Sequence, residues 1–271
     1  MASSAAPSNK AKIARRVVEV LEYFDDEHRE ATVMDIVRRY NRPQSSTSEL
    51  LSSLVELGLL YKDPYSRTYS LTARAALLGS TGQPEPIRDG RLVRLIDRLL
   101  AQTGLSVALF ARVNLKTQLL MIRNGPRASA LIANELFAGM QAPLVDNAAG
   151  LLLLSSIGRQ RCEGMVRRLN AEAAETDKFG FGEMMARIDT CRDHGHARGE
   201  LGFGIEARFG GMAAALVPGQ PDTHPLAVAI LHEGEDKVNA TALIEALGEA
   251  TAHCATIAAP MAFVEQFQTA A

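Results

Sequence analysis

The sequence predicts an α+β protein of two domains, an N-terminal winged helix-turn-helix followed by a larger sandwich of sheet and helices. Three observations support this class. The chain has 271 residues, which suits one small and one middle-sized domain. Its N-terminal part shows helical periodicity and then a short hairpin pattern, and its remainder alternates between helical and strand patterns. Apolar residues make up 47% and charged residues 22%, as in ordinary globular proteins.

Composition narrows the classes of protein. No apolar run has the length of a membrane span, and the start of the chain lacks the apolar core of a signal peptide, so we expect a cytoplasmic protein. The cysteines Cys162, Cys191 and Cys254 are too scattered for a disulfide framework, and we expect free thiols. The formal net charge of −2 neither supports nor excludes a nucleic-acid partner.

The first two helices are predicted from spacing and from start signals. Apolar residues recur at helical intervals over Ile13–Phe24, with charged residues on the other side. Thr32 stands three residues before Asp35, which is a box-like N-terminal signal for a second, short helix. Asn41 follows that helix, and Asn tolerates the left-handed conformation that a tight turn often requires.

A third helix and a hairpin complete the predicted winged helix. Gln44–Leu57 carries an apolar stripe that includes Leu57, and Gly58 ends the helix. Leu59–Lys62 and Arg67–Leu71 are predicted strands around the polar turn 63–66. In such a module the first turn of the third helix enters a major groove, and the hairpin lies along the DNA backbone.

The segment Arg42–Gly79, RPQSSTSELLSSLVELGLLYKDPYSRTYSLTARAALLG, resembles the winged helix-turn-helix of the IclR family of bacterial regulators. The resemblance implies duplex DNA as a partner and a homodimer or homotetramer as the assembly. Family members place a Lys-Ser-Thr run and then an Arg at the start of this helix. Gln44, Ser45, Ser46 and Glu49 stand there instead, so two basic positions are replaced.

Candidate DNA contacts follow from this placement. Glu49 either accepts a hydrogen bond from a cytosine amine or caps the helix together with Ser46 across the S-x-x-E spacing, or it is only solvated. Arg67 and Arg42 are candidate phosphate contacts, and the serine hydroxyls suit close approach to phosphate oxygens. The predicted DNA-binding residues are Arg42, Gln44, Ser45, Ser46, Ser48, Glu49, Lys62 and Arg67.

The domain plan assigns residues 10–71 to the DNA-binding domain, 72–87 to a linker helix and hinge, and 88–260 to the second domain. Glycines and prolines between Gly79 and Pro86 mark the hinge. The second domain is predicted to contain helices at 92–100, 142–156, 163–169, 183–191 and 239–257 and strands at 107–113, 118–122, 209–217 and 226–231. The long helix Ala142–Ser156 is almost wholly apolar in its second half and must be buried.

The second domain is similar to the GAF-like effector domain of IclR regulators, although this resemblance is looser. Val145 and Leu151 replace a histidine and a lysine of the family pattern, which favours an organic or aromatic acid as the effector. The resemblance implies a ligand site lined by Met140, Asn147, Ala148, Gly150, Cys191, Glu200 and Met212. The open alternative is a second domain that only oligomerises and binds no small molecule.

No catalytic residues, metal or cofactor are predicted. Cys191, His194 and His196 lie close in sequence, but the spacing lacks a fourth zinc ligand and the helix end at Gly195 explains it. The sequence has no G-x-S-x-G, H-E-x-x-H or phosphate-loop motif. Glu200 and Glu206 are the remaining pair of carboxylates, and their spacing does not place them on one helix face. We therefore expect a protein that is not an enzyme.

Overall fold

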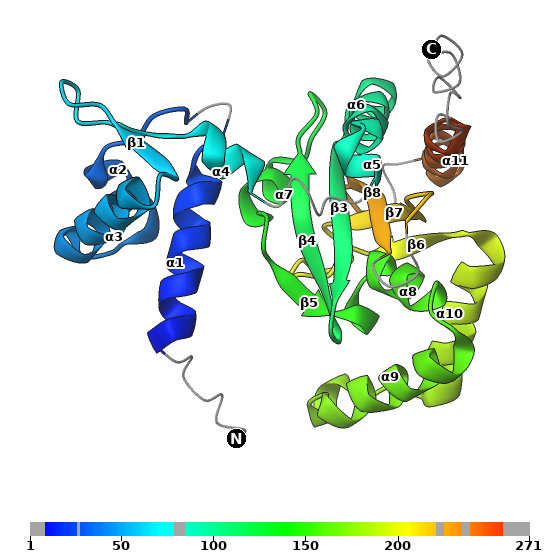
Figure 1. Ribbon diagram of the computed structural model, residues 1–271. Helices are drawn as coiled ribbons and strands as arrows, with labels where there is room; N and C mark the ends of the chain where they lie inside the picture. The colour runs from blue at the N-terminus through cyan, green and yellow to red at the C-terminus, as the bar shows by residue number, and fades with distance from the viewer. Residues whose placement is uncertain (1–8, 26–27, 79–84, 221–224, 235–238, 257–271) are drawn as a thin grey trace, which may run out of the picture. The chain divides into compact units, whose positions relative to one another are not determined.

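The computed structural model describes residues 9–25, 28–78, 85–220, 225–234 and 239–256 (Figure 1). The chain forms two compact units, Met1–Gln83 and Pro84–Ala271. Each unit has its own buried apolar core, as the length of the chain requires of two domains. Most of the predicted hinge, residues 79–84, lies outside the described residues.

The first unit is built from helices around one small core. Val20, Ile36, Leu51 and Tyr69 are each at most 2% exposed and meet in this core, so every long element contributes at least one anchor. Its elements are α1 (Asn9–Tyr23), α2 (Val33–Tyr40), α3 (Gln44–Glu56), β1 (Leu60–Lys62), β2 (Tyr69–Leu71) and α4 (Ala73–Leu77).

The predicted start and end of α2 are confirmed. The Thr32 hydroxyl accepts from the Asp35 backbone N–H, and the Asp35 carboxylate accepts from the Thr32 N–H at 2.8 Å. Asn41 ends the helix in the left-handed region with φ 48°. Because the turn is this tight, α3 starts directly after Pro43, and α2 and α3 form a helix-turn-helix.

The hairpin is shorter than predicted and is joined to a third segment. β1 pairs antiparallel with β2, with Lys62 opposite Tyr69. Ala31, before α2, forms a bridge to Tyr69 through two backbone hydrogen bonds of 3.0 and 2.7 Å. The hairpin is thereby tied to the helix-turn-helix. Arg67 belongs to the turn, because it takes the left-handed conformation with φ 57°.

Two apolar residues of the predicted helix stripes are not buried. Leu57, at the C-cap of α3, is 57% exposed, and Ile13 of α1 is 56% exposed. Inclusion of Leu57 in the stripe was wrong because the helix ends at this residue, while the buried face of α3 continues through Leu51 and Leu54.

The second unit is a six-stranded antiparallel sheet with the order β5-β4-β3-β8-β7-β6. Its strands are β3 (Ser106–Val113), β4 (Lys116–Arg123), β5 (Gln141–Pro143), β6 (His196–Glu200), β7 (Gly211–Leu216) and β8 (Leu226–His232). Its helices are α5 (Glu85–Arg88), α6 (Arg91–Thr103), α7 (Ala130–Glu135), α8 (Ala148–Ser155), α9 (Arg159–Glu172), α10 (Phe181–His194) and α11 (Ala240–Thr256), with the 3₁₀ turns η2 (Leu144–Asp146) and η3 (Glu175–Asp177).

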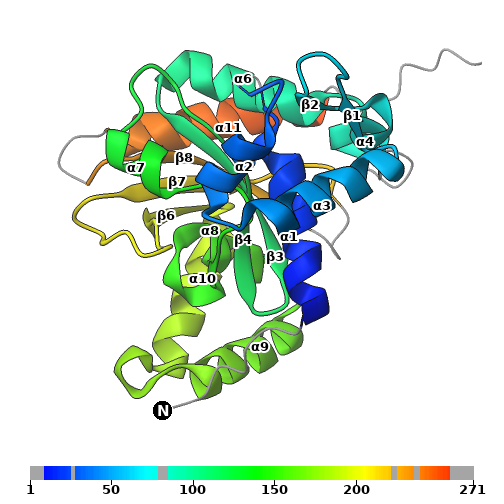
Figure 2. The ribbon, with the colours of Figure 1, turned by 90° about the vertical axis from the view of Figure 1, so that its left-hand side faces the viewer.

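Helices cover both faces of this sheet, which confirms the predicted α+β sandwich. Figure 2 shows α6 and α11 on one face and α8 with α10 on the other. Strands β7 and β8 are buried on both sides, since successive residues of each strand enter opposite cores.

The predicted helix 142–156 is wrong in its first half. Residues 141–143 form β5 on the edge of the sheet, 144–146 form η2, and α8 begins only at Ala148. Pro143 and the cap at Asn147 stop a helix from extending back, although the apolar run continues. Strand β6 and helix α7 were not predicted as such.

The capping box of α2 yields the first testable prediction. The Thr32 hydrogen bonds hold the pKa of Asp35 below its ordinary value, so they contribute stability above about pH 4 and lose it as the pH falls further. Thr32→Ala should therefore lower the free energy of unfolding of the first unit by about 1 kcal/mol at pH 7 and by less at pH 3. Urea unfolding of the full chain, followed by circular dichroism, measures both values. A loss of equal size at both pH values would contradict the carboxylate partner.

Candidate functional site

The first turn of α3 presents polar side chains to solvent. Gln44, Ser45 and Glu49 are exposed, while Thr47 and Leu51 on the other side are buried in the core. Ser46 and Ser48 are half-buried at the border of this face. The five predicted α3 residues, Gln44, Ser45, Ser46, Ser48 and Glu49, thus line one helix face, which we call the α3 surface.

The Ser46–Glu49 capping interpretation is wrong. Pro43 is the N-cap of α3 and gives no side-chain hydrogen bond, so Ser46 lies inside the first turn. Its hydroxyl donates to the Pro43 carbonyl oxygen at 3.2 Å. Glu49 therefore projects from the helix as an exposed carboxylate. A helix N-terminus without a side-chain cap also leaves backbone donors open to an anion.

Arg42 is engaged inside the first unit. Its guanidinium forms an ion pair with Glu19 of α1 and lies over the Tyr40 ring at 5.5 Å from the ring centroid. Only 20% of the Arg42 side chain is exposed. This pair links the helix-turn-helix to α1, so a phosphate contact by Arg42 would compete with Glu19.

Two predicted basic residues lie on the hairpin. Lys62 and Arg67 are exposed, and the Lys62 ammonium lies 5.4 Å from the centroid of the buried Tyr69 ring. The turn between them is fixed by Asp63, whose carboxylate accepts from two successive backbone N–H groups at 2.8 Å. These hydrogen bonds lower the pKa of Asp63, although removal of this carboxyl from solvent acts in the opposite direction. The turn therefore carries one fixed carboxylate between two cations.

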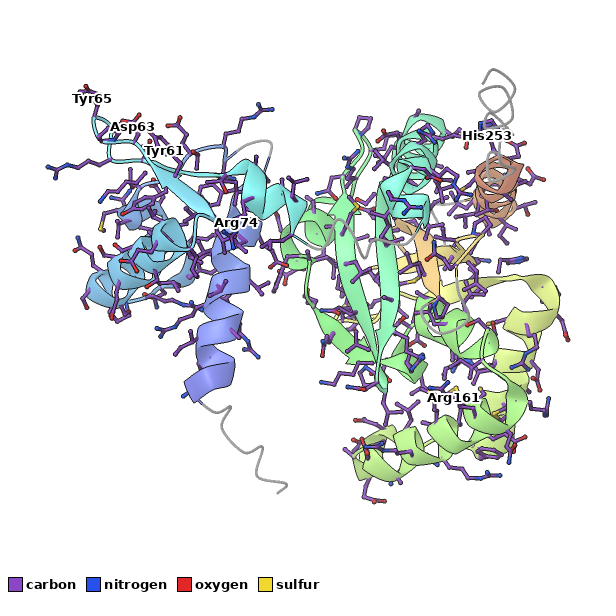
Figure 3. The ribbon with its side chains drawn as sticks, viewed as in Figure 1. Tyr61, Asp63, Tyr65, Arg74, Arg161 and His253 are labelled. Carbon is purple, nitrogen blue, oxygen red and sulfur yellow. The ribbon has the colours of Figure 1, made fainter. Side chains whose placement is uncertain are left out.

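Sequence reasoning missed two tyrosines on the same hairpin. Tyr65 is 95% exposed at the turn and Tyr61 is 54% exposed on β1 (Figure 3). The signal was present, because aromatic residues in a polar turn have no core to join. Both hydroxyls can donate to phosphate oxygens beside Lys62 and Arg67.

The predicted ligand residue Asn147 proves to be the N-cap of α8. It is 2% exposed, and its amide oxygen accepts from the Gly150 N–H at 2.8 Å. Its amide nitrogen donates to the Thr117 hydroxyl at 3.3 Å and to the Pro143 carbonyl at 3.2 Å. Both amide hydrogens have partners within the unit. Asn147 is thus a positioning residue for the helix start, and its ligand contact stays a prediction.

Most other predicted ligand residues gather on the α8 face of the sheet. Ala148, Cys191 and Met212 are buried in one core cluster, and Met140 packs against it. At Gly150 a Cβ atom would stand 2.1 Å from the Leu144 carbonyl oxygen and 2.5 Å from the Thr117 hydroxyl. Gly150 therefore allows close packing of α8 on the sheet.

Glu200 differs, because it is exposed at the end of β6. The pKa of Asp146 is raised, first by burial of its carboxyl and then by the negative charges of Asp177 and Glu200. Glu200 and Asp146 thus give a negative rim to the start of α8. An anionic ligand there has to overcome this repulsion.

The loop between β6 and β7 lies over the start of α8, and sequence reasoning missed its main side chain. A Cβ at Gly202 would come within 2.9 Å of the Asp146 carbonyl oxygen, so the loop approaches closely. Phe203 takes a left-handed φ of 56°, and its ring stacks on Phe110 of β3 with centroids 5.8 Å apart. Glycines at 202 and 204 signalled a turn but not where its aromatic ring would pack.

The three cysteines are free and buried, and burial raises the pKa of each thiol. Protonated thiols are poor nucleophiles and metal ligands. The His194 and His196 rings lie 5.6 Å apart, and their Nδ1 atoms contact the backbone carbonyls of Thr190 and His194. Among the described residues, no group of His, Cys, Asp and Glu is arranged to hold a metal ion, and no helix there could span a membrane.

Comparison with known proteins shows which kind of domain the first unit contains. Residues 14–64 match the IclR helix-turn-helix domain. The HTH-type transcriptional regulator TsaQ1/TsaQ2 of Comamonas testosteroni is 33% identical over 138 residues, which cover 49% of this chain and 49% of that protein. The chain thus spans about half the length of this curated relative.

Solved structures share the fold along most of the chain. An IclR transcriptional regulator from Alicyclobacillus acidocaldarius is 19% identical, with a TM-score of 0.58 over 90% of this chain and 98% of that one. An IclR homologue from Microbacterium hydrocarbonoxydans, complexed with 4-hydroxybenzoate, is 18% identical, with a TM-score of 0.60 over 90% and 98%. The Thermotoga maritima IclR is 16% identical, with a TM-score of 0.56 over 90% and 99%. These similarities confirm the predicted fold class.

The Asn147 cap yields the second testable prediction. Asn147→Ala removes the cap of α8 and leaves the Thr117 hydroxyl and the Pro143 carbonyl without this partner. We expect a loss of about 1–3 kcal/mol in the free energy of unfolding of the second unit. Urea unfolding of the full chain measures it, with Gln141→Ala, an exposed residue of β5, as the control. Equal stability of the two variants would contradict a structural role for Asn147.

Proposed function

We propose that this chain, whose residues 14–64 match the IclR helix-turn-helix domain, is a transcriptional regulator of the IclR type. It binds a pseudo-palindromic duplex as a homodimer or homotetramer and responds to a small organic acid. The observation that carries the DNA part is the α3 surface, an exposed polar helix face at an uncapped N-terminus. Symmetric half-sites require a symmetric assembly, because each winged helix reads one half. The second unit is the proposed effector-binding part.

The α3 surface and the hairpin differ in charge, and from this difference we infer different roles for them in DNA binding. The α3 surface has no cation and one carboxylate, so it reads base edges through Gln44, the serines and Glu49 and adds little attraction to phosphate. Lys62 and Arg67 on the hairpin provide the phosphate contacts, with Tyr61 and Tyr65 as hydroxyl donors. Affinity should therefore depend on the hairpin and sequence preference on α3, and the affinity should weaken with salt.

The third testable prediction separates these roles. Arg67→Ala should weaken binding to every duplex by about 1 kcal/mol and keep the preferred sequence, because one charge-assisted phosphate contact is lost. Glu49→Arg should strengthen binding to all duplexes, since repulsion from phosphate is removed. Selection from random duplexes and fluorescence anisotropy with the full chain measure both effects.

The matched control is Arg168→Ala on α9, where an exposed arginine pairs with Glu172 in the second unit. Alanine at position 67 keeps the Cβ atom of arginine in the same left-handed conformation, so the turn should remain. A changed consensus with unchanged affinity in Arg67→Ala would reject the phosphate role. Unaltered or weaker binding by Glu49→Arg would place that residue away from the groove. A wild-type chain that remains monomeric and prefers no duplex would reject the proposal itself.

For the effector we propose an aromatic monocarboxylate bound between the start of α8 and the β6–β7 loop. The Phe110–Phe203 pair supports an aromatic ligand, because a further ring can stack there or replace Phe203. The Microbacterium hydrocarbonoxydans homologue is a neighbour in fold with bound 4-hydroxybenzoate. Burial of Ala148, Cys191 and Met212 in the core favours the alternative, in which the second unit only oligomerises.

The fourth testable prediction decides between these alternatives. Adding 4-hydroxybenzoate or benzoate should change the affinity for the selected duplex by about 5- to 150-fold, the usual size of such coupling. Phe203→Ala should alter the response, whereas Phe209→Ala, an exposed residue of the same loop, should not. Anisotropy titrations of each chain with and without ligand measure this. Operator affinity that no aromatic acid changes would support the oligomerisation alternative.

A further inference from the structure

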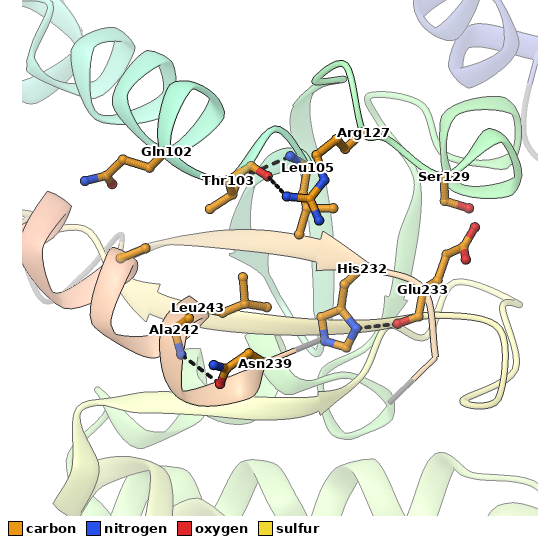
Figure 4. Close-up of a pocket in the computed structure, with 11 residues that line it drawn as sticks. Gln102, Thr103, Leu105, Arg127, Ser129, His232, Glu233, Asn239, Ala242 and Leu243 are labelled. Carbon is orange, nitrogen blue, oxygen red and sulfur yellow. Dashed lines mark hydrogen bonds between the residues drawn. The ribbon is translucent and has the colours of Figure 1, made fainter. Parts of the chain in front are cut away.

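A separate cavity of about 440 Å³ lies on the other face of the sheet from α8 (Figure 4). It is formed where α6 ends, where β8 ends and where α11 begins. Leu105 and Leu243 in its wall belong to the core between the sheet and the helices α6 and α11. Its volume falls within the range of small-molecule sites. None of the seven predicted effector residues lines it.

The cavity contains a cation with unused donors. Arg127 is exposed, and in the described part of the chain its only side-chain hydrogen bond is from Nη1 to the Thr103 carbonyl oxygen, at a long 3.4 Å. Figure 4 shows its guanidinium directed into the same space as the His232 ring. The guanidinium fork suits a planar carboxylate, which it can bind through two parallel hydrogen bonds.

Three other polar residues of the cavity wall, His232, Ser129 and Asn239, lie in or directly beside regular elements of the second unit. His232 is 3% exposed, and its Nδ1 donates to the Glu233 carbonyl oxygen at 2.5 Å, which fixes the ring. Ser129 is the N-cap of α7 but makes no side-chain capping bond. Asn239 accepts from the Ala242 N–H at the start of α11, at 3.3 Å. The Ser129 hydroxyl is therefore a further polar group of the wall that the helix start does not use, and Figure 4 shows it on the side of Glu233.

Apolar side chains and one carboxylate restrict the class of ligand. Leu105, Leu243 and Ala246 provide the hydrocarbon part of the wall. Glu233 also lines the cavity, so a ligand with two negative charges meets one cation and one anion and gains little. We propose that this cavity is a second ligand site that binds a small organic monocarboxylate, with its carboxylate on Arg127 and its hydrocarbon body on Leu105 and Leu243.

The test uses the full chain and the probe 4-bromobenzoate, with butyrate as an aliphatic probe and inorganic phosphate as the multiply charged contrast. Calorimetry should show binding of at least one carboxylate and much weaker binding of phosphate. Arg127→Gln should weaken carboxylate binding roughly ten- to hundredfold, because the charge-assisted pair is lost. Arg123→Gln is the matched control, since Arg123 pairs with Asp97 and does not line the cavity.

A second variant tests the same cavity without changing Arg127, so that an altered fold in Arg127→Gln cannot be mistaken for loss of the site. Ala242 is exposed and lines the cavity, so Ala242→Phe should fill the entrance, keep the fold and weaken binding as well. In crystals soaked with 4-bromobenzoate, the bromine should give an anomalous peak beside Leu243. Absence of binding by either carboxylate overturns the proposal. Carboxylate binding that survives both variants, or that is lost only in Phe203→Ala, also overturns the proposal. Phosphate binding as tight as that of the carboxylates overturns it as well. Operator binding is not a readout here, so failure of this site leaves the proposed DNA function untouched.

Discussion

Close packing of α8 on the sheet is the constraint on which the second unit depends. Gly150 has no room for a side chain against the Leu144 carbonyl and the Thr117 hydroxyl. Asn147 binds the same hydroxyl and caps the helix, so one buried polar junction sets both the depth and the start of α8. Buried amides need all their partners, and this junction supplies them. The loop over α8 can approach closely only because the helix starts where it does.

In the first unit, the corresponding constraint is the tight turn at Asn41. A left-handed residue there, followed at once by Pro43, lets α2 stop and α3 begin within three residues. The core face of α3 is then filled by Leu51 and Leu54, which commits the opposite face to solvent. Exposure of the α3 surface is thus a consequence of local backbone geometry and core packing. Neither the turn nor the core restricts which polar side chains stand on that surface, and Glu49 is one example.

Local signals made much of this fold predictable. The Thr32–Asp35 box, the turn at Asn41 and the end of α3 just before Gly58 act within a few residues, and the structure has all three. Long-range packing explains the failures. Apolar composition alone could not show that residues 141–143 pair with β4, because the run reads equally as a buried helix. The role of Asn147 depends on Thr117, thirty residues away, and the Phe110–Phe203 stack joins residues even farther apart.

The middle of the sheet relates the two faces of the second unit to each other. Along β7, Met212 and Ala214 face α8, whereas Ala213 and Ala215 face α6 and α11. Small side chains on both faces bring helices close to these strands on either side, and a closely packed interior transmits a shift instead of absorbing it. A ligand beneath the β6–β7 loop and one beside His232 would therefore act on the same pair of strands. Two sites on opposite faces need no direct contact to influence each other, provided that each favours a different position of the helices packed on β7 and β8.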